Sequence, residues 1–171
     1  MTSRLIAIAC CGFSACLASP VSPSRGPYLA VPPALQSTMT LLDEDAWQHP
    51  LLTEPMGAWV RRYVRRMVVD PALPPHVGAL WVDATDTLHI RPDQVPPHLR
   101  VSLTASTILH ETRHAEGYRH PCQRNGAFVD RALRDGGAFA VEIYYLQHVR
   151  ETWQAERLQT LYIGCEAPGV F

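Results

Sequence analysis

The segment HETRHAEGYRH occupies positions 110–120 and has the most informative spacing in this sequence. It begins with two histidines four positions apart and an acidic residue directly after the first of them. Residues four apart on an α-helix lie on the same face, so His110 and His114 can direct both imidazoles at one cation. Glu111 lies beside them, where a carboxylate can take a proton from a water molecule. The spacing therefore predicts a helix that carries a zinc site.

The end of the same stretch offers a third ligand. Zinc in a catalytic site binds three protein ligands and keeps one coordination position open. Gly117 can adopt a positive φ at little steric cost, so the helix can end there and the chain can turn back. This turn would bring His120 toward the metal, and we expect His110, His114 and His120 to bind Zn²⁺.

The pattern HExxHxxGxxH resembles the signature of the metzincins, a group of zincin metallopeptidases, and matches it at His110, Glu111, His114, Gly117 and His120. The resemblance implies a zinc-dependent peptidase that acts on a peptide or protein substrate, with Glu111 as the general base. It covers the motif alone. Metzincins also have a methionine in a tight turn downstream of the third histidine, whereas every methionine of this chain lies upstream of the motif. The chain therefore resembles a divergent small family of bacterial zincins with a metzincin-like ligand set.

A second helix is predicted from about Gly136 to about Trp153, with Glu142 inside its apolar stripe. A buried carboxylate is costly unless a donor or a cation contacts it. Glu142 could accept a hydrogen bond from the far nitrogen of a zinc-bound histidine. It could instead bind zinc directly, as the glutamate on the later helix does in gluzincins, which this pairing of helices also resembles. The third alternative is a position in water at the edge of the stripe.

Three further side chains could contact a substrate near the motif. Tyr144 and Tyr145 are candidates to donate a hydrogen bond to an oxyanion. Arg113 could bind a substrate carboxylate, but an ion pair with Glu116 on the exposed side of the helix is the simpler interpretation.

The pattern of apolar and polar residues in the rest of the chain predicts a small α+β domain. An amphipathic helix is expected over 54–69, a β-hairpin over 77–91 with its turn at 83–87, and the motif helix over 102–116. In zincins a strand beside the motif helix pairs with extended substrate, so the resemblance implies that one hairpin strand does so here.

The N-terminal segment predicts export. Residues 1–18 have an arginine, an apolar run too short to span a bilayer, and small residues, as in a secretory signal. Phe13 to Cys16 resembles a bacterial lipobox, which would make Cys16 the lipidated N-terminus and attach the protein to a membrane. The alternative is ordinary cleavage, giving a periplasmic or secreted protein. Residues 19–37, rich in proline and serine, predict a mobile tether, and 38–171 the folded domain.

The composition and the cysteines agree with this interpretation. The chain has 171 residues and a net charge of −1, which fits one domain and argues against nucleic-acid binding. Cys122 and Cys165 are the only cysteines downstream of the signal, and an exported pair is expected to form a disulfide. Cys122 as a zinc ligand is the alternative. A different class of function also stays open, namely a non-catalytic envelope lipoprotein with a structural or sensing zinc site.

Overall fold

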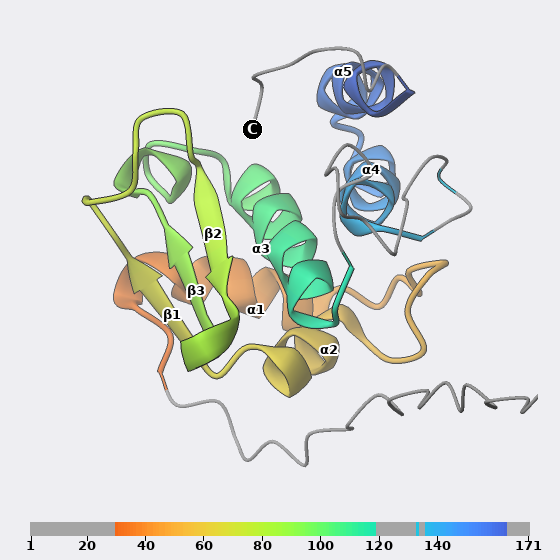
Figure 1. Cartoon of the computed structure of the whole chain (residues 1–171). Coiled ribbons are helices and arrows are strands. Elements are labelled where there is room, and N and C mark those ends of the chain that lie inside the picture. The colour runs from red at the N-terminus through yellow and green to blue at the C-terminus, as the bar shows by residue number, and fades with distance from the viewer. Residues whose placement is uncertain (1–29, 119–132, 134–135, 164–171) are drawn as a thin grey trace, which may run out of the picture.

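A computed structural model describes residues 30–118, 133 and 136–163 of the chain (Figure 1). This part consists of helices and one three-stranded sheet, which confirms the predicted α+β class. The α-helices are α1 (Gln36–Glu44), α2 (Met56–Tyr63), α3 (Val101–Ala115), α4 (Ala138–His148) and α5 (Thr152–Ile163). The strands are β1 (Arg66–Val69), β2 (Ala79–Val82) and β3 (Thr87–Ile90), and short 3-10 turns are η1 (Pro33–Leu35), η2 (Asp83–Thr85) and η3 (Pro92–Gln94).

The sheet has the strand order β1-β3-β2. β3 lies in the centre, parallel to β1 and antiparallel to β2, so the predicted hairpin over 77–91 is confirmed. Leu88 and Ile90 of β3 are fully buried, as expected for a central strand with one face on the core. β1 and β2 are the outer strands of this sheet, and β2 is the outer strand on the side of α3, which it contacts.

The motif helix α3 lies between the sheet and α4 (Figure 1). Its bounds confirm the predicted helix over 102–116 to within one residue at either end. Ala105, Ile108 and Leu109 are fully buried in the core of the domain, which also contains side chains of α1, α2 and β3. The opposite side of α3 carries Ser106, His110 and His114, four residues apart, and faces a cleft.

The prediction of one helix over 54–69 is wrong in its second half. α2 ends at Tyr63, Val64 has extended backbone angles, and the chain continues as β1. The positions assigned to the apolar stripe of a longer helix, Met67 and Val68, instead pair with β3. Met67 is buried in the core, so hydrogen bonding to β3 and burial together outweigh the helical pattern.

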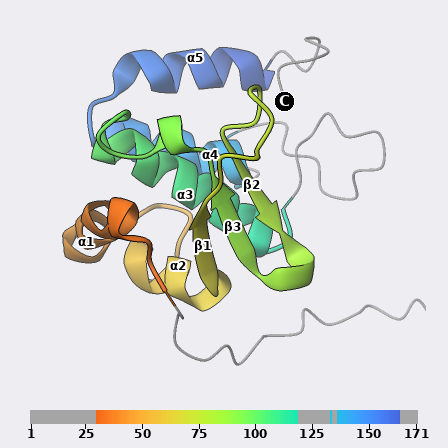
Figure 2. The same ribbon diagram turned by 90° about the vertical axis from the view of Figure 1, so that its left-hand side faces the viewer.

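The prediction of one helix over 136–153 is also wrong at its C-terminal end. α4 ends at His148, and a turn in which Arg150 adopts φ 61° separates it from α5. α5 packs back on α4, where Ala155 and Leu158 contact a cluster that includes Ile143. Figure 2 shows α5 as a separate layer beyond α4. The sequence periodicity continues across the break, which is why the turn was not predicted.

Residues 30–37, assigned to the tether by their composition, belong to the folded part. Ala30 forms a β-bridge with Arg66, Pro33 begins η1, and Leu35 is fully buried. The other N-terminal predictions, the signal over 1–18 and Cys16, lie outside the described residues. None of the described helices has the length and the apolar composition needed to cross a membrane.

Candidate metal centre

Two imidazole nitrogens of α3 face each other at the distance expected for a shared metal ion. His110 Nε2 and His114 Nε2 are 3.2 Å apart. Two nitrogens that each lie about 2.05 Å from a tetrahedral zinc would be separated by about 3.3 Å. A carboxylate oxygen of Glu111 and one nitrogen of each histidine lie within 4.8 Å of one another. The predicted histidine pair is thus brought together by one helical turn.

The other nitrogen of each ring, Nδ1, lies beside a hydrogen-bond acceptor. His114 Nδ1 lies 2.7 Å from the carbonyl oxygen of Tyr118, and a carbonyl can only accept, so Nδ1 carries the hydrogen. His110 Nδ1 lies 2.9 Å from Glu142 Oε2 and donates to this carboxylate. When both rings are neutral, each Nε2 presents its lone pair, and two lone pairs at 3.2 Å repel unless a proton or a metal cation lies between them. These residues therefore fit a cation such as Zn²⁺, which prefers imidazole nitrogen.

The turn after α3 orients His114. Gly117 has φ 107°, and its N–H donates to the carbonyl of His114 while the Tyr118 N–H donates to that of Arg113. These two bonds satisfy carbonyls at the end of the helix, as a glycine C-cap does. They also place the Tyr118 carbonyl beside His114 Nδ1. The predicted role of Gly117 in ending the helix is confirmed.

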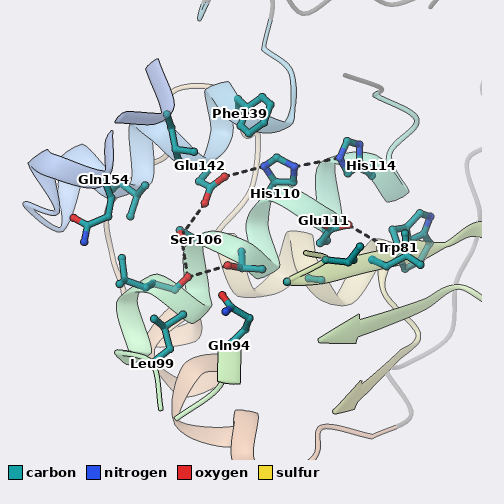
Figure 3. A pocket seen from close by; sticks show the side chains of 18 of the residues that line it. Trp81, Gln94, Leu99, Ser106, His110, Glu111, His114, Phe139, Glu142 and Gln154 are labelled. Carbon is teal, nitrogen blue, oxygen red and sulfur yellow. Dashed lines mark hydrogen bonds and ion pairs between the residues drawn. The ribbon is translucent and has the colours of Figure 1, made fainter. Parts of the chain in front are cut away.

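Two residues of α4 hold the ring of His110, and Figure 3 shows them beside it. Glu142 bridges two positions of α3, because its Oε2 lies 2.9 Å from His110 Nδ1 and its Oε1 lies 3.2 Å from Ser106 Oγ. Phe139, one turn earlier on α4, packs edge-to-face on His110 with 4.8 Å between ring centroids. Glu142 thus lies on the Nδ1 side of His110, away from the Nε2 atom that faces His114. Of the three alternatives for Glu142, this arrangement corresponds to the hydrogen bond to the far nitrogen.

Glu111 is buried beside the histidines. Its Oε2 accepts a hydrogen bond of 2.9 Å from the backbone N–H of Trp81 on β2, so the edge strand and α3 meet at this carboxylate. Burial raises the pKa of Glu111 above its usual range, while the charge of His110 and the bond from Trp81 act in the opposite direction. A raised pKa favours a carboxyl group that both takes up and releases a proton.

A cleft of about 870 Å³ opens at these residues. One wall consists of β2 and the segment before it, the floor of α3, and the other wall of α4 and α5. His110, Glu111, His114 and Glu142 lie at one end. The volume is within the range of pockets that bind small molecules and short peptides.

Several predicted site residues lie elsewhere or outside the described part. His120, Cys122 and Cys165 are outside the described residues. Tyr144 and Tyr145 do not line the cleft. Tyr145 is fully buried in the core, and the ring of Tyr144 packs near His49, so the prediction that they contact an oxyanion is not supported.

Arg113 forms the predicted ion pair with Glu116, but it does so as a buried side chain. Its Nε donates to the Gly136 carbonyl, and its guanidinium lies over the Tyr118 ring. Arg113 therefore joins the end of α3 to the segment before α4 and does not line the cleft.

Sequence reasoning missed two partners of the site. Ser106 lies four residues before His110, so the spacing along the helix could have identified it. The backbone N–H of Trp81 carries no sequence signal, because any residue except proline has a backbone N–H.

The chain was compared with known proteins. No family model, no curated protein and no solved structure matches it.

Proposed function

We propose that this protein is a zinc-dependent peptidase whose site is built on α3. His110 and His114 would hold the metal through Nε2, and His120 is our candidate for the third ligand. Zn²⁺ in such a site supplies Lewis acidity, which polarises a carbonyl oxygen and makes a water molecule more acidic. The observation that carries the proposal is the pair of Nε2 atoms 3.2 Å apart, each on a ring whose Nδ1 already has an acceptor.

Glu111 is the candidate general base. It lies next to His110 in sequence and within 4.8 Å of both imidazoles, at the end of the cleft, where an attacking water could reach it. The N–H of Trp81 holds one carboxylate oxygen in place and leaves the other for proton transfer. A structural zinc site would not require this carboxylate, because its coordination shell is closed.

The edge strand supports a peptide as the substrate. In an antiparallel pair the backbone groups alternate in direction, and Trp81 directs its N–H away from β3 toward Glu111. The backbone groups of Ala79 point the same way, along the wall of the cleft. An extended peptide could pair with this edge, as in other cases of β-strand addition.

The test is the change Glu111→Gln, with Glu44→Gln as the matched control, because Glu44 is exposed on α1. We expect Glu111→Gln to retain zinc and to lose at least about 100-fold in kcat on a peptide library, the usual contribution of a general base. Glu44→Gln should behave as the unchanged protein. Retained hydrolysis in Glu111→Gln would contradict the assignment of the base. Zinc binding without turnover in the unchanged protein would support the non-catalytic alternative.

The place of action is proposed from the sequence. We propose that the protein is exported to the bacterial cell envelope, either lipidated at Cys16 or released after cleavage of the signal. Mass spectrometry of the mature N-terminus distinguishes these two forms.

A further inference from the structure

We propose that Arg157, supported by Trp153, recognises a carboxylate of the substrate, so that this peptidase acts on acidic peptides. The inference rests on the proposed peptidase function and adds a substrate class to it. Both residues belong to α5 and line the cleft. They lie four residues apart on the helix, and the Arg157 guanidinium lies 5.5 Å from the centre of the Trp153 ring.

The charges of the cleft are unevenly distributed. Its described acidic lining residues are Asp83, Glu111 and Glu142, which belong to β2 and its turn, α3 and α4. Arg157 is the one lysine or arginine among the described residues that line it. An anionic group of a bound peptide that lies along the α5 wall is therefore attracted to Arg157.

Arg157 has no acidic partner within the described part of the chain. Six other described arginines form ion pairs with aspartate or glutamate, namely Arg61, Arg62, Arg65, Arg91, Arg100 and Arg113. Over the same residues, the ring of Trp153 is the one partner found for Arg157. A guanidinium that already has a carboxylate is poorly suited to bind another, whereas Arg157 can offer its paired N–H groups to an incoming one.

Two large hydrophobic side chains that line the cleft are exposed to solvent. Leu80 and Trp153 are the exposed large hydrophobic residues of the described part, at 46% and 63% exposure, and both line this cleft. Leu80 comes from β2 and Trp153 from α5, so they belong to opposite walls. A peptide between them would bury both side chains and exclude water from its contact with Arg157, which strengthens a charged hydrogen bond.

The experiment compares kcat/KM for matched peptides that carry Glu, Gln or Lys near the cleaved bond, each with a free or an amidated C-terminus. The unchanged protein should prefer Glu over Gln by about 10-fold, the size of a charge-assisted hydrogen bond in a partly exposed site. Arg157→Gln should abolish this preference, and Arg157→Glu should reverse it toward Lys. The effect of amidation distinguishes a side-chain carboxylate from a terminal one.

Arg150→Glu is the matched control, because Arg150 is exposed in the turn before α5 and does not line the cleft. It changes the net charge as much as Arg157→Glu and should keep the preference for Glu. Equal hydrolysis of the Glu and Gln peptides, or a preference that survives Arg157→Gln, would overturn the inference.

A binding measurement separates this inference from the proposed function. The affinity of the same peptides for the Glu111→Gln variant, by titration calorimetry, needs no turnover. If the unchanged protein hydrolyses no peptide, the peptidase proposal fails, and the affinities of the Glu and Gln peptides still decide whether Arg157 binds a carboxylate. Equal affinities would overturn the role of Arg157.

Discussion

Glu142 on α4 accepts a hydrogen bond of 2.9 Å from Nδ1 of His110 on α3, and this contact fixes which side of the imidazole faces the cleft. Glu142 also contacts Ser106 one turn earlier, so a single carboxylate connects two turns of α3 to α4. The orientation of a metal-facing histidine thus depends on a residue thirty-two positions away in the sequence.

The first prediction concerns this carboxylate. Glu142→Leu should weaken zinc binding by about 10- to 100-fold, because His110 loses the acceptor that orients its ring and raises its basicity. Glu142→Gln keeps an acceptor but loses the charge, and its effect should be smaller. Competition with a chromophoric chelator measures both. Ser106→Ala is the control, because the Ser106 hydroxyl contacts Glu142, whereas His110 is contacted by the other carboxylate oxygen of Glu142. An unchanged zinc affinity in Glu142→Leu would contradict the orienting role.

The second prediction concerns the turn that ends α3. Gly117→Ala should lower the free energy of unfolding by about 1–3 kcal/mol, because φ 107° is strained for a residue with a side chain. It should also weaken zinc binding, since the turn places the Tyr118 carbonyl beside His114 Nδ1. Gly78→Ala is the control, because an added Cβ there meets only an ordinary contact of 3.4 Å. Urea denaturation measures the stability of both variants, and equal stabilities would contradict the account of the turn.

The third prediction concerns removal of the metal. A ligand that binds only the folded state stabilises it by about 2.7 kcal/mol when its concentration is 100 times its Kd. A chelator should therefore lower the Tm by about 10 °C for a domain of this size, and added zinc should restore it. His114→Ala should show no shift with chelator. The absence of a shift in the unchanged protein would argue against a metal bound to the folded domain.

The fourth prediction concerns His49, a buried histidine outside the cleft. Its Nε2 donates to the Val141 carbonyl at 2.9 Å and its Nδ1 accepts from the Leu51 N–H at 3.1 Å, so the neutral ring satisfies both neighbours. Burial lowers the pKa of His49 from 6.5 to about 4, against the bond to Val141, which raises it. Protonation would turn an acceptor toward Leu51 into a second donor.

The sign of the pH dependence follows from this lowered pKa. The unfolded chain binds a proton at His49 more readily than the folded one, so the free energy of unfolding should fall as the pH decreases from 6.5 to about 4. The total loss is on the order of 3 kcal/mol, from about 1.4 kcal/mol per pKa unit. His49→Gln should flatten this part of the curve, whereas His98→Gln, at an exposed position, should leave it unchanged. Identical curves for the unchanged protein and His49→Gln would contradict the prediction.

Local spacing in the sequence was sufficient to predict the motif helix, its glycine C-cap and the histidine pair. All of these depend on residues within two or three turns of one helix. The hairpin was predictable for the same reason, since its strands are joined by a short turn. Glu142 was identified as a carboxylate inside the apolar stripe of the second predicted helix, but the choice among its three alternatives depends on how α4 packs against α3.

The predictions that were wrong or missing share a physical cause, which is packing between segments that are distant in the sequence or separated by a turn. Residues 66–69 have a helical pattern of apolar positions, and pairing with β3 decides their conformation instead. The break at Arg150 is decided by the packing of α5 on α4. Arg157 and Trp153 were not predicted as site residues. An arginine and a tryptophan one turn apart are common on helices, and only the fold shows that these two line the cleft.

The most direct test of the account is the zinc content of the purified full chain, compared with His114→Ala, His120→Ala and Glu142→Gln. We predict stoichiometric zinc in the unchanged protein and in Glu142→Gln at saturating metal, and loss of zinc in both histidine variants. Loss of zinc in Glu142→Gln with full zinc in His120→Ala would instead make Glu142 a direct ligand. Full zinc in His114→Ala would contradict a metal site on α3.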